Sequence, residues 1–249
     1  MTKNIGTNFF KKTTYKYLES SDQQKDLPQP ALELEYDISK QLINLPKPNE
    51  LKIEDISLRT CIEARQSIRK YSEESLNLNE LSFLLWCTQG IRDDTRGAVT
   101  LRNVPSAGAR HAFETFILVN QVEGLKPGVY RYIATKHKLI EFSFEEGIAD
   151  KITKGAYNQS MVKKSAVTFI WVAIAYRMTY RYGERGYRYM LIDAGHVGQN
   201  LYLAAENLSC GACVIAAFHD EELNDIMGLD GEEHFVIYLA SVGKKKVKD

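Results

Sequence analysis

Apolar and polar positions divide the chain near residue 50. Before this point the sequence is polar, shows little periodicity and contains four of the six prolines. A residue that precedes proline favours extended backbone. We therefore interpret residues 1–50 as an extended arm that wraps the body of the protein or a partner subunit, and residues 51–249 as one folded domain.

Two helices are expected where this domain begins. The first covers about Leu51–Ser67, and the second begins directly after Asn77. Asn77 is suited to the N-cap, and Glu80 stands at the position that completes a capping box. Leu76 and Leu81 flank this start and can form a hydrophobic staple. The basic stretch before Asn77 should therefore connect the two helices.

Several later segments have the composition of strands. β-branched and aromatic residues are typical of strands, and they predict them at Phe113–Val119, Gly128–Ile133, Ala212–Phe218 and His234–Gly243. Ala166–Tyr176 is apolar at consecutive positions, which predicts a strand that is buried on both faces.

A long apolar helix is expected at about Tyr187–Leu208. Its main apolar stripe consists of Leu191, Ala194, Gly195, Gly198, Leu201, Tyr202, Ala205 and Leu208. Other faces of the helix also carry apolar residues, so we expect it at the centre of the fold or at a dimer interface. Glycines within the stripe permit close approach of a neighbouring backbone.

A shorter helix is predicted from Asp220, its expected N-cap, to Gly228, which should end it. Helices and strands follow one another without the regular alternation of βαβ units. This order predicts an α+β fold with a mixed sheet.

Composition and charge narrow the function classes. Of the 249 residues, 44% are hydrophobic, which is enough for a sizeable core. The 32 basic residues balance the 32 acidic ones, so no overall field favours nucleic acid or a membrane surface. The chain start lacks the apolar region of a signal peptide, and no apolar run reaches the length of a membrane span. We therefore expect a cytoplasmic protein.

The four cysteines fit a reducing compartment, where thiols remain free. Cys210 and Cys213 follow a helical segment and lead into a strand, which reverses the order found in thioredoxin-like redox sites. A zinc site would need a second pair at similar spacing, whereas Cys61 and Cys87 stand alone. We interpret the pair as buried structural residues. The histidines show no metal-ligand spacing either, so no metal is expected.

Three short stretches carry the candidate chemistry. RQSIR at residues 65–69 offers guanidinium groups and a hydroxyl, and VGKKK at residues 242–246 offers ammonium groups. Both suit a phosphate. PSAGARH at residues 105–111 is small and permissive, so its backbone can lie against a flat ligand. Together the three suit an organic phosphate with a ring, although each basic stretch alone is more typical of a solvated helix end or chain end.

These stretches, together with GYRYMLIDAGHVGQNLYLAAENLSCGAC and AAFHDEELNDIMGLDGEEHFVIYLASVGK, resemble the FMN-dependent nitroreductase superfamily, in its branch similar to SagB-type dehydrogenases. The likeness extends over nearly the whole chain and includes the arm. It implies a mainly antiparallel sheet flanked by helices. It also implies FMN as the cofactor and a homodimer with the long helix at its interface.

The resemblance implies roles for the basic residues. The element that begins at Arg65 and includes Gln66 and Ser67 would bind the phosphate and ribityl end of FMN. Arg69 would lie near N1 and O2 of the flavin ring, where a positive charge stabilises the reduced form. The phosphate site would be completed by Lys244 and Lys245.

The resemblance also implies which residues meet the flavin ring. One side would be covered, usually from the other subunit, by Pro105, Ser106, Ala107 and Gly108. The opposite side, near N5, would be covered by the backbone of Ile215, Ala216 and Ala217. Relatives often have a glycine in this last stretch, which this sequence lacks.

Azoline-oxidising members of the family use a Lys-Tyr pair, for which Arg181 and Tyr182 are the nearest candidates here. Arginine stays protonated and carries protons poorly, so the lysine role does not transfer directly. Asn158 and Gln159 are candidates for the substrate side and are expected in a helical segment before the buried strand.

The sequence thus favours an FMN-dependent oxidoreductase that passes electrons from NAD(P)H to a small organic acceptor, such as a nitroaromatic or a quinone, by a ping-pong mechanism. An FMN-dependent dehydrogenase of a peptide-derived or secondary-metabolite heterocycle is the alternative within the enzymes. A non-catalytic flavin-binding or partner-binding module is the alternative outside them.

Overall fold

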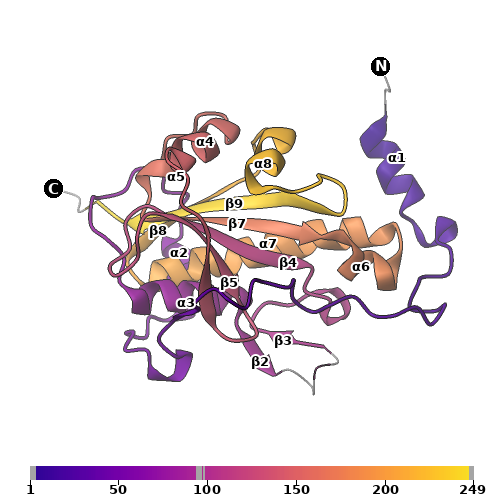
Figure 1. The fold of residues 1–249 in the computed structure, drawn as a ribbon, viewed down its shortest axis with the longest axis horizontal. Helices are drawn as coiled ribbons and strands as arrows, with labels where there is room; N and C mark the ends of the chain where they lie inside the picture. Colours follow the sequence, from indigo (N-terminus) through magenta and orange to yellow (C-terminus); the bar gives the residue numbers. More distant parts are fainter. Residues whose placement is uncertain (1–3, 94–96, 98, 247–249) are drawn as a thin grey trace.

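A seven-stranded antiparallel sheet forms the centre of the fold (Figure 1). The computed structural model describes residues 4–93, 97 and 99–246. The strands follow the order β1-β6-β5-β4-β7-β9-β8, and neighbouring strands run antiparallel. Their bounds are β1 Ile43–Asn44, β4 Phe113–Val119, β5 Gly128–Ile133, β6 Lys138–Ser143, β7 Val167–Ile174, β8 Cys210–Ile215 and β9 His234–Lys244. A separate two-stranded sheet pairs β2 (Ile91–Asp93) with β3 (Leu101–Arg102).

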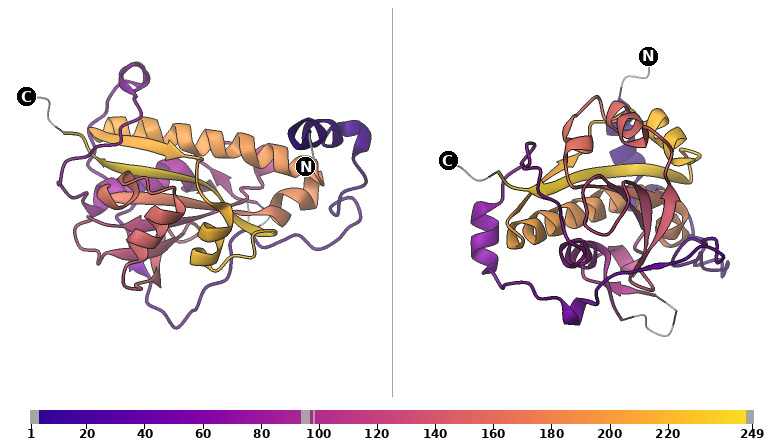
Figure 2. Two further views of the ribbon diagram at one scale, coloured as in Figure 1. Left: turned by 90° about the horizontal axis from the view of Figure 1, so that it is seen from above. Right: turned by 60° about the vertical axis from the view of Figure 1, so that its left-hand side comes forward.

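Helices cover both faces of the large sheet. Figure 2 shows the long α7 lying against one face, where α2 and α3 pack beside it, while α4, α5 and α8 cover the other face. The helices are α1 Ile5–Lys12, α2 Leu58–Ala64, α3 Leu78–Gln89, α4 Ile148–Gly155, α5 Met161–Lys164, α6 Ala175–Tyr182, α7 Arg185–Asn207 and α8 Asp220–Met227. The predicted α+β class is therefore confirmed. Within the described ranges, no helix has both the length and the apolar character needed to cross a membrane.

The predicted central strand and the predicted start of α3 are confirmed. Every residue of β7 is buried, and its neighbours are β4 and β9. At α3, Asn77 and Glu80 form the full capping box, and Leu76 and Leu81 are both completely buried. The strand ends at Ile174 rather than at Tyr176, because α6 begins there. A continuous apolar run does not distinguish a buried strand from a buried helix.

The prediction of a helix over Leu51–Ser67 is wrong in its extent. α2 begins only after Ser57, whose side chain accepts a hydrogen bond from the Thr60 backbone, and it ends at Ala64. The chain then becomes extended because it pairs with the sheet: the Ile68 backbone N–H donates to the Ala212 carbonyl at 2.9 Å. The basic stretch is therefore a connector between two helices, as expected, and it lies along the edge of β8.

The C-terminal helices match the prediction with small shifts. α8 starts at Asp220 itself, so His219 rather than Asp220 occupies the N-cap, and Gly228 ends the helix at a φ of 67°. α7 begins two residues before the predicted start. Most of its apolar stripe is buried, but Leu191 and Gly195 are exposed, Leu191 by 58%, and the neighbouring Ile192 is 51% exposed in the chain.

Cys210 and Cys213 are buried on opposite faces of β8 and belong to different hydrophobic cores. Side chains three positions apart on a strand point in opposite directions, so these two thiols cannot meet. Burial raises the pKa of Cys210 to about 12, which keeps its thiol protonated. Both observations agree with structural cysteines.

The arm follows the body as mostly irregular backbone between α1 and β1 (Figure 1). α1 was not expected; it contains no buried residue, so its sequence lacks a core-facing stripe. It is held from outside, because the Arg188 guanidinium lies 4.9 Å from the Phe10 ring and donates to the Phe10 carbonyl.

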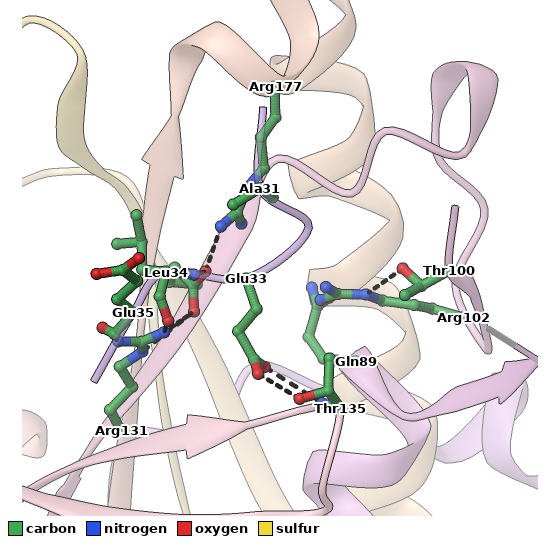
Figure 3. Close-up of polar contacts among 11 residues, drawn as sticks. Ala31, Glu33, Leu34, Glu35, Gln89, Thr100, Arg102, Arg131, Thr135 and Arg177 are labelled. Carbon is green, nitrogen blue, oxygen red and sulfur yellow. Dashed lines mark hydrogen bonds and ion pairs between the residues drawn. The ribbon is translucent and has the colours of Figure 1, made fainter. Parts of the chain in front are cut away.

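A buried cluster of charges fixes the middle of the arm to the sheet (Figure 3). Glu114 on β4 accepts hydrogen bonds from Arg177 at 2.6 Å, from Arg131 at 3.2 Å and from the Leu34 backbone at 2.8 Å. The two arginines also donate to arm carbonyls, Arg177 to Ala31 and Arg131 to residues 34 and 35. The arm thereby supplies hydrogen-bond partners to ions that would otherwise be buried with fewer of them, although the Arg177 Nη1 has no partner among the described residues.

Candidate functional site

Tyr202 on α7 organises the start of the basic stretch. The Arg65 guanidinium lies 5.0 Å from the centre of the Tyr202 ring, a cation–π contact. The Tyr202 hydroxyl accepts from the Val214 backbone N–H at 3.2 Å and lies 2.8 Å from the Ser67 Oγ. Since it accepts from Val214, the hydroxyl is free to donate its own proton to Ser67. One tyrosine thus positions both Arg65 and Ser67.

The end of β9 lies beside this stretch. The Ser72 backbone N–H donates to the Lys244 carbonyl at 3.0 Å, and Tyr71 forms a bridge with Lys245. Lys244 is paired with Glu80 of the α3 capping box, and Lys245 is paired with Glu206 of α7. Burial lowers the pKa of Lys244, but the hydrogen bond to Glu80 and the nearby negative charges together outweigh it and raise the pKa above its ordinary value. Carboxylates therefore hold both lysines in place.

Gln66 and Arg69 are exposed. Burial raises the pKa values of Tyr71 and Cys213, and the positive charge of Arg69 opposes the rise at both. The charge of Arg69 is therefore close enough to act on both groups. The region as a whole offers guanidinium, hydroxyl and ammonium donors from the connector and from β9, a set that matches the oxygens of a phosphate.

The PSAG loop, Pro105–Gly108, is fixed by Asp193 on α7. The Asp193 Oδ1 accepts from the Ala107 backbone N–H at 3.3 Å, while its Oδ2 is buried without a hydrogen-bond partner among the described residues. Burial raises the pKa of this carboxyl group. Gly108 adopts a φ of 58°, and a Cβ atom there would lie 2.4 Å from the Tyr182 hydroxyl. Position 108 thus requires glycine for both conformation and space.

This contact brings several predicted residues together. Gly108 lies against Tyr182 and also against Arg181, since its Cβ position would be 3.2 Å from the Arg181 side chain. Within one chain, however, the PSAG loop and the basic stretch meet α7 at different points. Asp193 and Tyr202 are nine positions apart, which corresponds to about 13 Å along a helix.

The last two candidate groups are adjacent. Gln159 donates from its side chain to the Ala217 carbonyl at 2.8 Å, beyond the end of β8. Ile215 is buried, whereas Ala216 and Ala217 are exposed. Asn158 and Gln159 do not lie in a helix as expected. They occupy the turn between α4 and α5, where Asn158 has a φ of 56°.

Three residues of this region were not singled out from the sequence. Tyr202 was assigned to the apolar stripe of its helix, and Asp193 and Glu206 are buried acids on the same helix. A buried acid on an otherwise apolar stripe is a usable signal, because an unpaired carboxylate is costly to bury. The partners of these acids, however, come from distant parts of the chain. Among the residues that the structure describes, no group of three or more His, Cys, Asp or Glu is arranged to hold a metal.

Substituting Tyr202 by phenylalanine should destabilise the protein by about 1–2 kcal/mol, because the Val214 N–H and the Ser67 hydroxyl lose a buried partner. Urea unfolding of the variant and the parent measures this difference. Tyr238→Phe is the matched control, since no described residue hydrogen-bonds the Tyr238 hydroxyl. An equal loss of unfolding free energy in both variants would show that the hydrogen bonds of the Tyr202 hydroxyl do not stabilise the protein.

Comparison with known proteins identifies the family. The Nitroreductase family model matches residues 62–244, which include the connector, the PSAG loop and β9. A protein of Methanocaldococcus jannaschii named as a nitroreductase, MJ1384, is 34% identical over 203 residues, which are 82% of this chain and 96% of that protein. The chain belongs to the nitroreductase family.

Two further similarities extend this comparison. The trifolitoxin operon protein TfxC of Rhizobium leguminosarum bv. trifolii is 26% identical over 72% of this chain, and the match spans about half, 53%, of TfxC. A chain of the E. coli microcin synthetase McbBCD complex, solved with truncated pro-MccB17 bound, has the same fold with a TM-score of 0.61 at 18% identity. That match covers 98% of this chain and 92% of the other, so it includes the arm.

Proposed function

We propose that the protein is an FMN-dependent oxidoreductase that transfers electrons from NAD(P)H to a small organic acceptor, such as a nitroaromatic or a quinone, by a ping-pong mechanism. The observation that carries this proposal is that the connector with Arg65 and Ser67 runs beside the end of β9 that carries Lys244 and Lys245, although the two segments are far apart in the sequence. FMN would supply the redox chemistry, and the protein would bind and orient it.

The residues present fit the phosphate and ribityl end of FMN. Arg65 offers a two-pronged donor that is already positioned by Tyr202, and Ser67 adds a hydroxyl. Lys244 and Lys245 add positive charge, which Glu80 and Glu206 position. Gln66 and Arg69 are exposed beside them, and we assign Arg69 to N1 and O2 of the flavin ring.

A homodimer would bring the PSAG loop to this end of the site. Within the chain, the loop meets α7 about 13 Å from Tyr202, so we assign the ring contact of Pro105, Ser106, Ala107 and Gly108 to the other subunit. The exposed Leu191 and Ile192 support a dimer interface on α7, because such residues favour burial against a second surface.

The backbone of Ile215, Ala216 and Ala217 would cover the side of the flavin near N5. Its contact with Gln159 supports a role of Asn158 and Gln159 near the substrate, since Gln159 fixes the Ala217 carbonyl. Arg181 and Tyr182 lie beside the PSAG loop and are our candidates for the groups that meet the substrate from the opposite side.

A second candidate function is oxidation of a peptide-derived or secondary-metabolite heterocycle by bound FMN. The similarity to TfxC and the match of arm and body together to a chain of the microcin synthetase complex favour it. Arginine at position 181 argues against a proton-transfer role like that of the lysine in azoline-oxidising relatives.

The visible spectrum of the purified protein tests both candidates. We expect a yellow protein whose flavin band bleaches when NADH or NADPH is added without oxygen and returns when a nitroaromatic or quinone is added. Bleaching by an azoline-containing peptide but not by NAD(P)H would favour the second candidate. A yellow protein that neither donor reduces would indicate a non-catalytic flavin-binding module, and a colourless protein that cannot be reconstituted with FMN would reject both enzymes.

A further inference from the structure

A polar cavity of about 660 Å³ lies between the arm and the end of α6. A volume of this size is typical of sites for small ligands. Its lining includes Tyr15, Glu19, Gln23, Gln24, Arg181 and Tyr182. Most of the lining comes from the arm and offers side chains that form hydrogen bonds.

The arm wall of this cavity is held by specific contacts on both sides. The Gln23 backbone N–H donates to the Tyr180 carbonyl at 2.9 Å, and the Tyr180 hydroxyl donates to the Leu27 carbonyl at 2.9 Å. Before the cavity, Arg185 donates to the Thr13 carbonyl at 2.8 Å. Contacts with Tyr180 and Arg185 of the body therefore fix the arm as one wall of the cavity.

The inner end of the cavity lies next to the PSAG loop. Tyr182 lines the cavity, and its hydroxyl occupies the space that a side chain at Gly108 would fill. A ligand in the cavity would therefore lie beside the loop that we assign to the flavin ring. This step depends on the proposed function.

Two guanidinium groups lie near the PSAG loop at this end of the cavity, and that of Arg181 is part of the lining. Arg181 is exposed and has no carboxylate within ion-pair distance among the residues that the structure describes. Arg110 lies close by and donates to the Gly108 carbonyl at 3.1 Å. Both guanidinium groups approach Gly108, since the Arg181 side chain would lie 3.2 Å from a Cβ atom there, and burial followed by the charge of Arg181 lowers the pKa of Arg110. Glu19, on the arm wall, carries the opposing charge.

We propose that this cavity is the substrate site and that Arg181 selects substrates that carry a carboxylate, while the arm supplies hydrogen bonds to amide or hydroxyl groups. A guanidinium binds a carboxylate through two parallel charge-assisted hydrogen bonds, a contact that a neutral amide cannot reproduce. Glu19 would weaken the preference by repulsion. The arm is thus part of the specificity of the enzyme.

The test compares 4-nitrobenzoate with 4-nitrobenzamide as electron acceptors of the full-length FMN-loaded protein. In Arg181→Gln, the ratio of kcat/KM for the carboxylate to that for the amide should fall about tenfold, since a charged contact is lost. In Glu19→Gln, the same ratio should rise about twofold to threefold. Lys47→Gln, which removes a positive charge from an exposed pair with Glu50, is the control and should leave the ratio unchanged.

Unchanged ratios in both cavity variants, or shifts of the same size in the control, would overturn the proposal. Both positions are exposed, so neither substitution endangers folding. If the protein binds no FMN, the proposed function fails but the cavity can still be tested. Proton NMR titration of the full chain with 4-nitrobenzoate should then show binding that Arg181→Gln weakens, and absence of binding to the parent would reject the site itself.

Discussion

Replacing Glu114 by glutamine is expected to cost about 3–5 kcal/mol of unfolding free energy, because two buried guanidinium groups lose their shared counterion. Glu114 is 3% exposed, as is expected of a carboxylate that is fully paired. The arm should loosen as well, since Leu34 loses its acceptor. Urea unfolding measures the first effect, and the rate of proteolytic cleavage in residues 20–40 measures the second.

The matched control is Glu141→Gln, the same substitution at an exposed position on β6, which should cost little. A similar loss of unfolding free energy in both variants would show that the buried cluster does not stabilise the fold. An unchanged rate of arm cleavage in Glu114→Gln would show that the cluster does not fix the arm.

The Glu114 cluster also predicts a pH dependence. Burial raises the pKa of Glu114, but the charges of Arg177 and Arg131, together with the hydrogen bonds from Leu34 and Arg177, outweigh it and hold the pKa below its ordinary value of 4.5. A carboxyl group with a lowered pKa contributes stability that is fully present above its unfolded-state pKa. This contribution is lost as the pH falls through the lower folded-state pKa. The stability difference between the parent and Glu114→Gln should therefore narrow below pH 4.5.

The elements that sequence reasoning predicts well are those with a local signal. The capping box at Asn77 and the apolar run of β7 are both contained in a few consecutive residues. α1 could not be found in this way, because it buries no side chain and depends on Arg188 of α7. The helix over Leu51–Ser67 was predicted too long, because pairing of Ile68 with Ala212 is a tertiary contact that competes with helix formation.

In the candidate site, too, residues in local motifs were predicted, whereas residues defined by tertiary contacts were missed. The residues proposed to bind FMN were found because motifs carry them, and their roles stay a prediction. Tyr202 and Asp193 were missed, since a helix stripe reveals burial but not the partner that a polar group meets. The Glu114 cluster was missed for a similar reason: its arginine partners lie 17 and 63 positions away in the sequence. Only the folded chain brings these charges together.

The double substitution Arg65→Ala with Arg69→Ala is expected to weaken FMN binding at least 100-fold. Each guanidinium would make a charged hydrogen bond to the cofactor, and such bonds contribute about 1.5–3 kcal/mol each. Loss of two such bonds raises the dissociation constant by about two powers of ten or more. Quenching of FMN fluorescence during titration with the apoprotein measures this constant directly, without any assay of turnover.

Lys70→Ala provides the control, because Lys70 is an exposed cation of the same stretch for which we expect solvation only. Arg65→Lys separates charge from geometry: it keeps the charge but loses the two-pronged donor, so an intermediate affinity is expected. Thermal unfolding must show that each variant folds, since Arg65 also packs on Tyr202. An equal loss of FMN affinity in Lys70→Ala would show that the connector acts only through its overall positive charge. Unchanged affinity in the double variant would show that the connector is not part of the cofactor site.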